Sequence, residues 1–228
     1  MALYAIGDLH LSLGTDKSME VFGGGWQNYV VRLQDAFAKL HEDDVTVLCG
    51  DLSWGMSLDE SLEDLRFINA LPGRKILVKG NHDYWWNTAA KMTRFFSEHG
   101  LDKLEILHNN CLWYGDTALC GTRGWFYELD GGAQNEKLLA REAGRLETSL
   151  QCAGTAKKLC FLHYPPLYQG YNCPQVLELL RRYGVSACCY GHLHGVSHRR
   201  AVEGSREGTA FSLVSADYLG FVPKKICD

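Results

Sequence analysis

The sequence predicts an α/β fold, because short buried strands alternate with amphipathic helices along its first hundred residues. Apolar runs with the composition of buried strands occupy residues 3–6, 45–49 and 75–79. Apolar residues recur at helical spacing before the second and third of these runs. This βαβαβ order is typical of a sheet with parallel strands. With 228 residues and 46% hydrophobic content, we expect a single domain that spans residues 1–228.

The individual elements follow from the same patterns. The two early helices are marked by Trp26, Val30, Leu33, Phe37 and Leu40, and by Leu58, Leu62, Leu65 and Ile68. Three further helices are expected over residues 87–99, 136–150 and 174–184, the last opened by Pro174. Two later strands are expected at residues 158–162 and 187–190. Gly and Asn turns within residues 105–122 and 196–215 predict hairpins, which fit a second sheet.

Five fragments rich in metal-ligand residues follow strand-like runs. They are Asp8-Leu9-His10, Gly50-Asp51, Gly80-Asn81-His82-Asp83, Leu162-His163-Tyr164 and Gly191-His192-Leu193-His194-Gly195. Ligand sites of open α/β sheets gather at strand ends. We expect Asp8 and His10, and His192 and His194, to converge because an extended backbone sends residues i and i+2 to one side. The inventory is sufficient for two divalent ions, and mixed His, Asp and Asn ligands suit Mn, Fe or Zn.

The order D-x-H, GD, GNHD, a lone His and GH-x-H resembles the calcineurin-like metallophosphoesterase superfamily, in particular its small bacterial phosphohydrolases and phosphodiesterases. The resemblance implies a two-sheet α/β/β/α sandwich with helices on the outer faces. It assigns one ion to Asp8, His10, Asp51 and His194. It assigns the other to Asp51, Asn81, His163 and His192, with both oxygens of the Asp51 carboxylate used in bridging the ions. It also makes His82 the catalytic imidazole.

The implied reaction is hydrolysis of a phosphomonoester or a small phosphodiester. Two ions about 3.5–4 Å apart lower the pKa of a bridging water, and the resulting hydroxide attacks phosphorus in line. His82 follows a ligand in the chain without being one, so we expect it to protonate the leaving group. Asp83 is a second catalytic candidate. It either orients His82 or caps a helix that begins near Tyr84, and the cap is the preferred interpretation.

Composition and the start of the chain bear on nucleic-acid binding, on the redox state of the cysteines and on cellular location. A net charge of −4 does not indicate the basic surface that a protein needs to bind along a nucleic-acid backbone, so a dedicated nuclease is disfavoured. The nine cysteines lack a C-x-x-C pattern and are expected to be reduced core residues. Met1 runs directly into the first strand, without room for a signal peptide, and no apolar stretch approaches the roughly 20 residues of a membrane span. We therefore expect a cytoplasmic protein without membrane contact.

Substrate contacts are less clearly marked. The chain reads Gly50-Asp51-Leu52-Ser53-Trp54, without the arginine that protein phosphatases of the superfamily carry shortly after this aspartate. Candidates to contact a substrate phosphate are therefore Arg123 and Lys17, the latter within a segment, residues 14–25, that is either a lid or a surface loop. Tyr164 is a candidate rim residue. Aromatic residues follow several motifs, among them Tyr84, Trp85, Trp86, Trp125, Phe126 and Tyr168, and either pack the core or stack on substrate.

Two alternatives to a phosphohydrolase acting on a small phosphate ester stay open. One is a nuclease acting on short or single-stranded nucleic acid, which would require a basic groove. The other is a metal-stabilised interaction module without turnover. An intact ligand set together with His82 favours the hydrolase.

Overall fold

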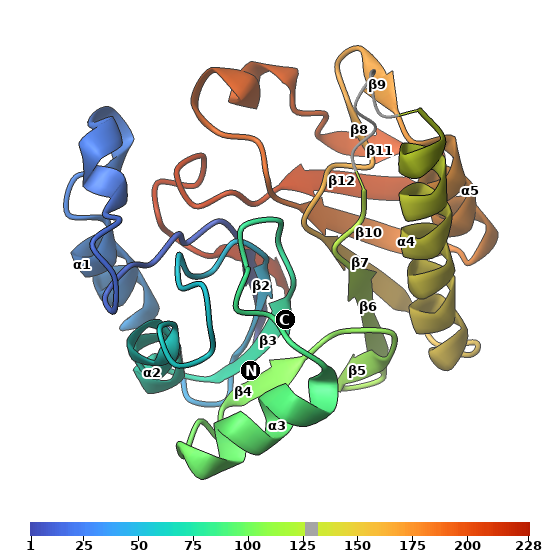
Figure 1. The fold of residues 1–228 in the computed structure, drawn as a ribbon. Coiled ribbons are helices and arrows are strands. Elements are labelled where there is room, and N and C mark those ends of the chain that lie inside the picture. The colour runs from blue at the N-terminus through green and yellow to red at the C-terminus, as the bar shows by residue number, and fades with distance from the viewer. Residues whose placement is uncertain (126–131) are drawn as a thin grey trace.

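The structure, a computed structural model, describes residues 1–125 and 132–228 and contains two large β-sheets with helices outside them (Figure 1). The first sheet has the order β13 (Lys224–Cys227), β1 (Leu3–Ile6), β2 (Val45–Cys49), β3 (Arg74–Val78) and β4 (Leu104–Ile106). The second has the order β11 (Gly204–Arg206), β12 (Thr209–Leu213), β10 (Val185–Tyr190), β7 (Lys158–Leu162), β6 (Thr117–Thr122) and β5 (Cys111–Tyr114). A small hairpin pairs β8 (Leu167–Tyr168) with β9 (Tyr171–Asn172).

Parallel pairing dominates the centre of each sheet. Strands β1 to β4 are parallel to one another, as are β6, β7, β10 and β12. In the two large sheets of the described chain, the antiparallel pairs are those of the edge strands β13, β11 and β5. All residues of β2 and β7 are buried, as expected for strands covered on both faces. The carboxyl ends of β1, β2 and β3 therefore share one edge of their sheet.

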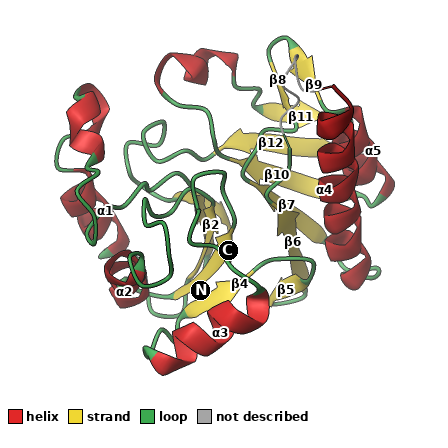
Figure 2. Ribbon diagram, in the orientation of Figure 1, coloured by secondary structure: helices red, strands yellow, loops and turns green. Residues whose placement is uncertain are grey.

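The helices lie on the outer faces of the two sheets (Figure 2). Helices α1 (Tyr29–Phe37), α2 (Leu62–Ala70) and α3 (Ala89–Glu98) accompany the first sheet, and α4 (Gly132–Cys152) and α5 (Pro174–Arg182) accompany the second. Three short 3₁₀ helices, η1 (Met19–Phe22), η2 (Gly24–Trp26) and η3 (Gly195–Arg200), lie in the loops. None of the helices in residues 1–125 and 132–228 combines the length and the apolarity that crossing a membrane requires.

The predicted two-sheet sandwich is confirmed. A shared core joins the inner faces of the sheets, with Val47 and Ile76 from the first and Leu119 and Phe161 from the second. All nine cysteines are free thiols, and five of them, Cys49, Cys120, Cys160, Cys188 and Cys189, are buried strand residues, as predicted.

Some element predictions are wrong in detail. The two early helices are shorter than predicted: α1 spans Tyr29–Phe37, which leaves out Trp26 and Leu40, and α2 begins at Leu62, which leaves out Leu58. Trp26 belongs to η2. The expected hairpin over residues 105–122 is divided between the sheets. Strand β4 pairs parallel with β3, and only β5 and β6 form a hairpin. Periodicity does not reveal this division, because the partner of an edge strand is decided by long-range packing.

A buried lysine closes the end of α2. Lys75 is fully buried, and its Nζ donates hydrogen bonds to the carbonyl oxygens of Asn69 (3.3 Å), Leu71 (2.5 Å) and Gly73 (2.6 Å). The Asn69 carbonyl belongs to the last turn of α2 and the other two follow it, where orphan acceptors need partners. The side chain therefore fixes the connection between α2 and β3.

We expect Lys75→Met to lower the free energy of unfolding by about 1–3 kcal/mol, because it leaves buried carbonyls without a donor. Chemical denaturation monitored by circular dichroism measures the loss. Lys103→Met is the matched control, since Lys103 forms an ion pair with the exposed Glu42 and should cost less than about 1 kcal/mol. Equal losses for the two variants would contradict this role for Lys75.

The same lysine should make stability depend on pH. Burial lowers the pKa of Lys75 to about 8 from the ordinary value of 10.5. Between these values the unfolded chain binds more protons than the folded chain, so the free energy of unfolding rises with pH there. We expect the difference between the wild type and Lys75→Met to grow from pH 8 to pH 10. A constant difference over this range would refute the expectation.

Candidate metal centre

The predicted ligand residues meet where strand ends of both sheets face each other. From the first sheet come Asp8 and His10 after β1, Asp51 after β2 and Asn81 after β3. From the second sheet come His163 after β7, and His192 and His194 after β10. Backbone hydrogen bonds join the loops: the Asp8 amide donates to the Gly50 carbonyl, and the Gly191 amide donates to the His163 carbonyl.

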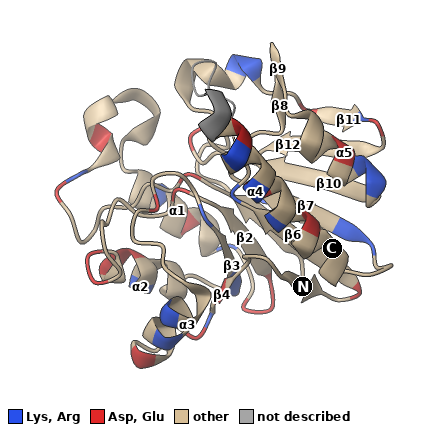
Figure 3. Ribbon diagram, turned by 45° about the vertical axis from the view of Figure 1, so that its right-hand side comes forward, with Lys and Arg blue, Asp and Glu red and all other residues tan. Residues whose placement is uncertain are grey.

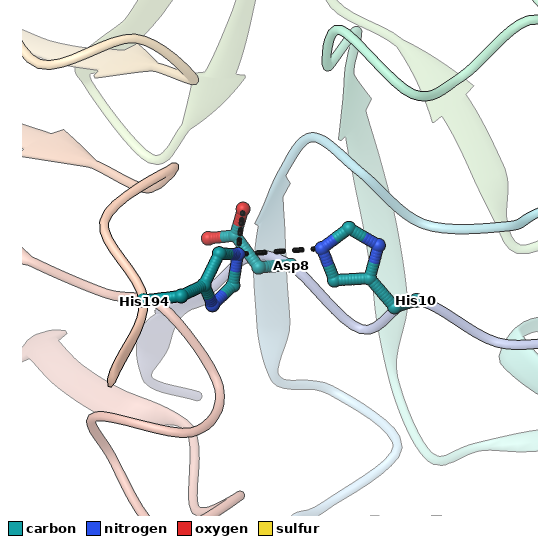
Figure 4. Close-up of side chains that lie close together, drawn as sticks. All are labelled: Asp8, His10 and His194. Carbon is teal, nitrogen blue, oxygen red and sulfur yellow. Dashed lines mark hydrogen bonds and ion pairs between the residues drawn. The ribbon is translucent and has the colours of Figure 1, made fainter. Parts of the chain in front are cut away.

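One cluster contains Asp8, His10 and His194 (Figure 4). The Nε2 atom of His194 lies 3.4 Å from Oδ1 of Asp8 and 3.3 Å from Nε2 of His10. Asp8 is fully buried and His10 nearly so. The three side chains therefore direct nitrogen and oxygen atoms at one small volume, as ligands of one ion would.

A second cluster surrounds the side-chain amide of Asn81. Its Oδ1 atom lies 2.6 Å from Nε2 of His163 and 3.0 Å from Nδ1 of His192. The other ring nitrogen of His163 lies 3.1 Å from the carbonyl oxygen of Cys49, which fixes the orientation of this imidazole. An amide oxygen and two imidazole nitrogens are again a set of metal ligands.

Asp51 lies between the two clusters. Its Oδ2 atom is 3.8 Å from Nε2 of His10 and 3.5 Å from Nε2 of His163. Its Oδ1 atom accepts a hydrogen bond from the His82 amide at 2.7 Å. Oδ2 of Asp51 thus lies near imidazole nitrogens of both clusters, while Oδ1 is hydrogen-bonded to the loop that carries His82.

The electrostatics of these side chains fit a bound cation. Burial, followed by the neighbouring Asp8, raises the pKa of Asp51 to about 8. Burial lowers the pKa values of His10 and His192 to about 3, so both imidazoles are neutral ligands at neutral pH. Burial also opposes protonation of His194, but Asp8 and Asp217 raise its pKa to about 10. Asp8 and Asp51 lie close together, so ionising both requires positive charge beside them, which His194 provides and which bound divalent ions would also provide.

The backbone turns sharply at several of these residues. Asp8, His10, Asp51 and His192 all have positive φ angles, at 58°, 46°, 52° and 73°. The expectation that an extended backbone aligns Asp8 with His10, and His192 with His194, is therefore wrong. Left-handed turns aim these side chains instead, and such conformations cost of order 1–3 kcal/mol each and cluster at functional sites. The intervening Leu9 is fully buried in the core and holds the turn in place.

Two motif glycines allow the loops to approach each other. A Cβ atom on Gly80 would lie 2.0 Å from Oδ1 of Asp51, and one on Gly191 would lie 2.5 Å from Oδ2 of Asp8. Each of these oxygens accepts a backbone hydrogen bond, Oδ1 of Asp51 from the His82 amide and Oδ2 of Asp8 from the His192 amide, so displacing either carboxylate would break that bond. Glycine is therefore required next to both carboxylates.

Asp83 connects the loops beneath the site. Its carboxylate accepts hydrogen bonds from the amides of Gly80 (2.7 Å), Asp51 (2.9 Å) and Leu52 (2.8 Å), and from Nε1 of Trp85 (3.0 Å). The predicted helix cap at Asp83 is wrong, because α3 begins at Ala89 with Thr88 as its N-cap. Its hydrogen bonds go to these loop amides and the indole, and the structure assigns it no bond to the His82 ring.

His82 lies beside the first cluster without joining it. Its ring centroid is 5.7 Å from that of His10 and 4.8 Å from that of Trp54. The Nδ1 atom is buried without a hydrogen-bond partner, so Nε2 is the nitrogen available to a reacting group. Burial is the main cause that lowers the pKa of His82 below its ordinary value.

The three candidate substrate contacts occupy different surroundings. Arg123 pairs with the buried Glu142 at 3.5 Å and covers the ring of Trp125. Its carbonyl oxygen accepts hydrogen bonds from the amides of His163 and Tyr164, which holds the His163 loop. The Tyr164 ring lies 4.5 Å from that of His192, at the second cluster. Lys17 is exposed and does not line the cavity beside the metal centre.

The aromatic candidates divide between packing and the site. Trp85 is buried in the core, and the Trp54 ring stacks on that of His10, with centroids 5.0 Å apart. Trp125 and Tyr168 pack at the core of the second sheet. Phe126 lies outside the described residues.

The sequence analysis missed Asp217. Its Oδ1 atom lies 3.0 Å from Nδ1 of His194, and its Oδ2 atom accepts a hydrogen bond from the Gly195 amide at 3.1 Å. A carboxylate in this position fixes the tautomer and orientation of an imidazole whose other nitrogen binds metal. Asp217 stands in the sequence Ser215-Ala216-Asp217, after an apolar strand, which is the signal that marked the other site residues.

Comparisons with known proteins place this geometry in context. The sequence profile described as calcineurin-like phosphoesterase matches residues 1–196. No curated protein matches the chain. The phosphopantetheinyl hydrolase PptH from Mycobacterium tuberculosis aligns with a TM-score of 0.60 and 15% identity, over 99% of this chain and 95% of that chain. The protein of unknown function AQ665 from Aquifex aeolicus aligns with a TM-score of 0.51 and 18% identity, over 98% and 95%. At these identities the two structures demonstrate a shared fold.

We expect Gly80→Ala to abolish stoichiometric metal binding, because the new methyl group displaces the Asp51 carboxylate. Metal content after loading with Mn²⁺ and desalting, measured by plasma mass spectrometry, tests this. Gly144→Ala is the control: this helical glycine has open space around its Cβ position, so metal content should stay unchanged. Full metal content in Gly80→Ala would show that the site tolerates the shift.

Proposed function

We propose that this chain, which belongs to the calcineurin-like phosphoesterase family, hydrolyses a phosphomonoester or a small phosphodiester at the centre between its two sheets. It is a metal-dependent phosphoesterase, and the family generally binds two divalent metals. The observation that carries the proposal is the position of Asp51 Oδ2 within 3.8 Å of imidazole nitrogens from both clusters. A carboxylate shared in this way is what two adjacent ions require.

The proposed ligands form two sets that share Asp51. The first ion would be held by Asp8, His10, Asp51 and His194. The second would be held by Asp51, Asn81, His163 and His192. The mixture of nitrogen and oxygen donors supports Mn, Fe or Zn rather than Mg or Ca. We further propose that the whole chain forms one domain, because both sheets contribute to a common core.

The ions, when bound, would supply Lewis acidity that activates water and neutralises the phosphoryl oxygens. The protein supplies the remaining parts. The Nε2 atom of His82 faces away from its buried Nδ1 and would give a proton to the leaving oxygen. Because the His82 amide donates to Asp51 Oδ1, the acid and the shared ligand keep a fixed separation. Asp83 acts as a positioning residue, since it binds the amides on both sides of this contact.

The distribution of charge favours a small substrate over a nucleic acid. In Figure 3, Lys and Arg positions are interspersed with Asp and Glu positions over the described chain and form no continuous stripe. Arg66, Arg94 and Arg181 are each paired with a neighbouring Glu on their own helix. A protein that tracks a phosphate backbone would present unpaired cations in a row.

We expect Mn²⁺-loaded protein to hydrolyse p-nitrophenyl phosphate or bis-p-nitrophenyl phosphate. Asp51→Asn should abolish turnover and remove bound metal. His82→Ala should lower kcat by about 10²–10⁴-fold with metal content unchanged, because it removes only the acid. His41→Ala, at an exposed loop position, is the control and should behave as the wild type. Unchanged kcat in His82→Ala would disprove its role as the acid.

Asp217→Asn tests the orientation of His194. We expect metal affinity to fall about 10–100-fold, because the imidazole loses the carboxylate that fixes its tautomer. Titration of metal-free protein with Mn²⁺, followed by calorimetry, gives the affinity, and saturating Mn²⁺ should restore most of kcat. Asp35→Asn, an exposed substitution on α1, should change neither quantity. Wild-type affinity in Asp217→Asn would contradict the positioning role.

A further inference from the structure

A cavity of about 580 Å³ opens beside the proposed first ion and His82. Its lining combines polar groups with apolar side chains. The polar groups are the imidazoles of His10, His82, His194 and His198 and the Asp217 carboxylate, and the apolar side chains are Met19, Phe22, Trp26 and Trp54. This volume falls in the range of sites for whole small molecules and exceeds what a phosphate group alone requires. The cavity therefore has room for the organic part of an ester.

Four apolar side chains give the cavity its hydrocarbon surface. Met19 and Trp26 are buried in the core, and the Trp54 ring stacks on His10. Phe22, with 72% of its surface exposed, lines the cavity together with the glycines of residues 23–25. Among the described residues that line the cavity there is neither Lys nor Arg, and His194 is already paired with the Asp217 carboxylate. A second phosphate or a carboxylate placed there would lose water without gaining a Lys or Arg partner, and Asp217 would repel it.

His82 determines which part of the substrate enters this cavity. On the proposed function, hydrolysis breaks the bond between phosphorus and the alcohol oxygen, water supplies the new oxygen on phosphorus, and His82 protonates the departing alcohol. The leaving oxygen must therefore lie at His82, and the rest of the alcohol must extend into the cavity that His82 lines.

We infer that the substrate is a phosphate ester of an uncharged, apolar alcohol, whose hydrocarbon part occupies the cavity formed by Met19, Phe22, Trp26 and Trp54. The inference rests on the proposed function, because it uses His82 as the acid. Burial of hydrocarbon against these side chains gives the specificity, and the Asp217 carboxylate together with the lack of Lys and Arg in the lining disfavours polyphosphates and esters with anionic alcohols.

The test uses ethyl, butyl, hexyl and octyl phosphate, whose leaving alcohols have nearly equal acidity. We expect kcat/KM to rise about threefold to fourfold per added methylene until the cavity is filled. Hexyl phosphate should be hydrolysed at least tenfold more efficiently than 6-phosphonooxyhexanoate, which adds a terminal carboxylate. Phe22→Ser should flatten the dependence on chain length. Val31→Ser, which removes another exposed apolar side chain, this one from α1, should preserve it.

A binding measurement separates this inference from the proposed function. Calorimetry of Mn²⁺-loaded protein should show octylphosphonate, which cannot be hydrolysed, binding more tightly than ethylphosphonate with a more negative heat capacity change. Equal kcat/KM for ethyl and octyl phosphate would overturn the apolar cavity but leave the phosphohydrolase intact. Absence of turnover with every ester would overturn the proposed function. The apolar cavity would then be tested by the phosphonate affinities alone, and equal affinities for octylphosphonate and ethylphosphonate would reject it.

Discussion

The arrangement of the rest of the site depends on two buried carboxylates, those of Asp8 and Asp51. They lie close together in a buried space, and burial, followed by the charge of Asp8, raises the pKa of Asp51 to about 8. The chain compensates with fixed donors. The amide of His192 donates to the Asp8 carboxylate at 3.0 Å, and the amide of His82 donates to Asp51 at 2.7 Å. Amide donors reduce the repulsion, whereas divalent cations would remove it.

This electrostatic demand explains the unusual backbone around the site. Amides can reach both carboxylates only if the loops pass at van der Waals distance, which is why Gly80 and Gly191 lack side chains and why several ligands adopt left-handed conformations. The strain is held by contacts outside the site. Asp83 binds amides from the loops after β2 and β3 together, and Leu9 anchors the first loop in the core. Positioning therefore depends on buried residues that a substrate does not reach.

The sequence revealed the site residues better than the path of the chain between them. A strand followed by His or Asp is a local pattern, and the structure brings all seven predicted ligands together. The conformations at Asp8 and His10 were not predictable, because non-glycine residues adopt positive φ only where tertiary contacts enforce it. Trp26 has the spacing of a helical core residue, but it lies in η2 and lines the cavity. Apolar spacing alone does not distinguish these two positions. Asp217 escaped notice because a lone Asp after a strand gains meaning only from its distance to His194.

The division of the ligands between the sheets links the proposed metal site to the fold. Each proposed ion takes ligands from both sheets: His194 completes a set that is otherwise from the first sheet, while His163 and His192 join Asn81 and Asp51. Neither sheet alone supplies a complete set. A bound ion would therefore hold the two sheets together at the carboxyl ends of their strands, and its binding free energy would add to that of the shared apolar core. Strands β7 and β10 carry the loops that contain His163, His192 and His194. Packing of one sheet against the other therefore positions the proposed ligands, His82 and the wall of the cavity relative to one another. The catalytic centre is thus a property of the interface between the sheets, and changes that shift one sheet against the other should affect metal affinity before they affect the fold of either sheet.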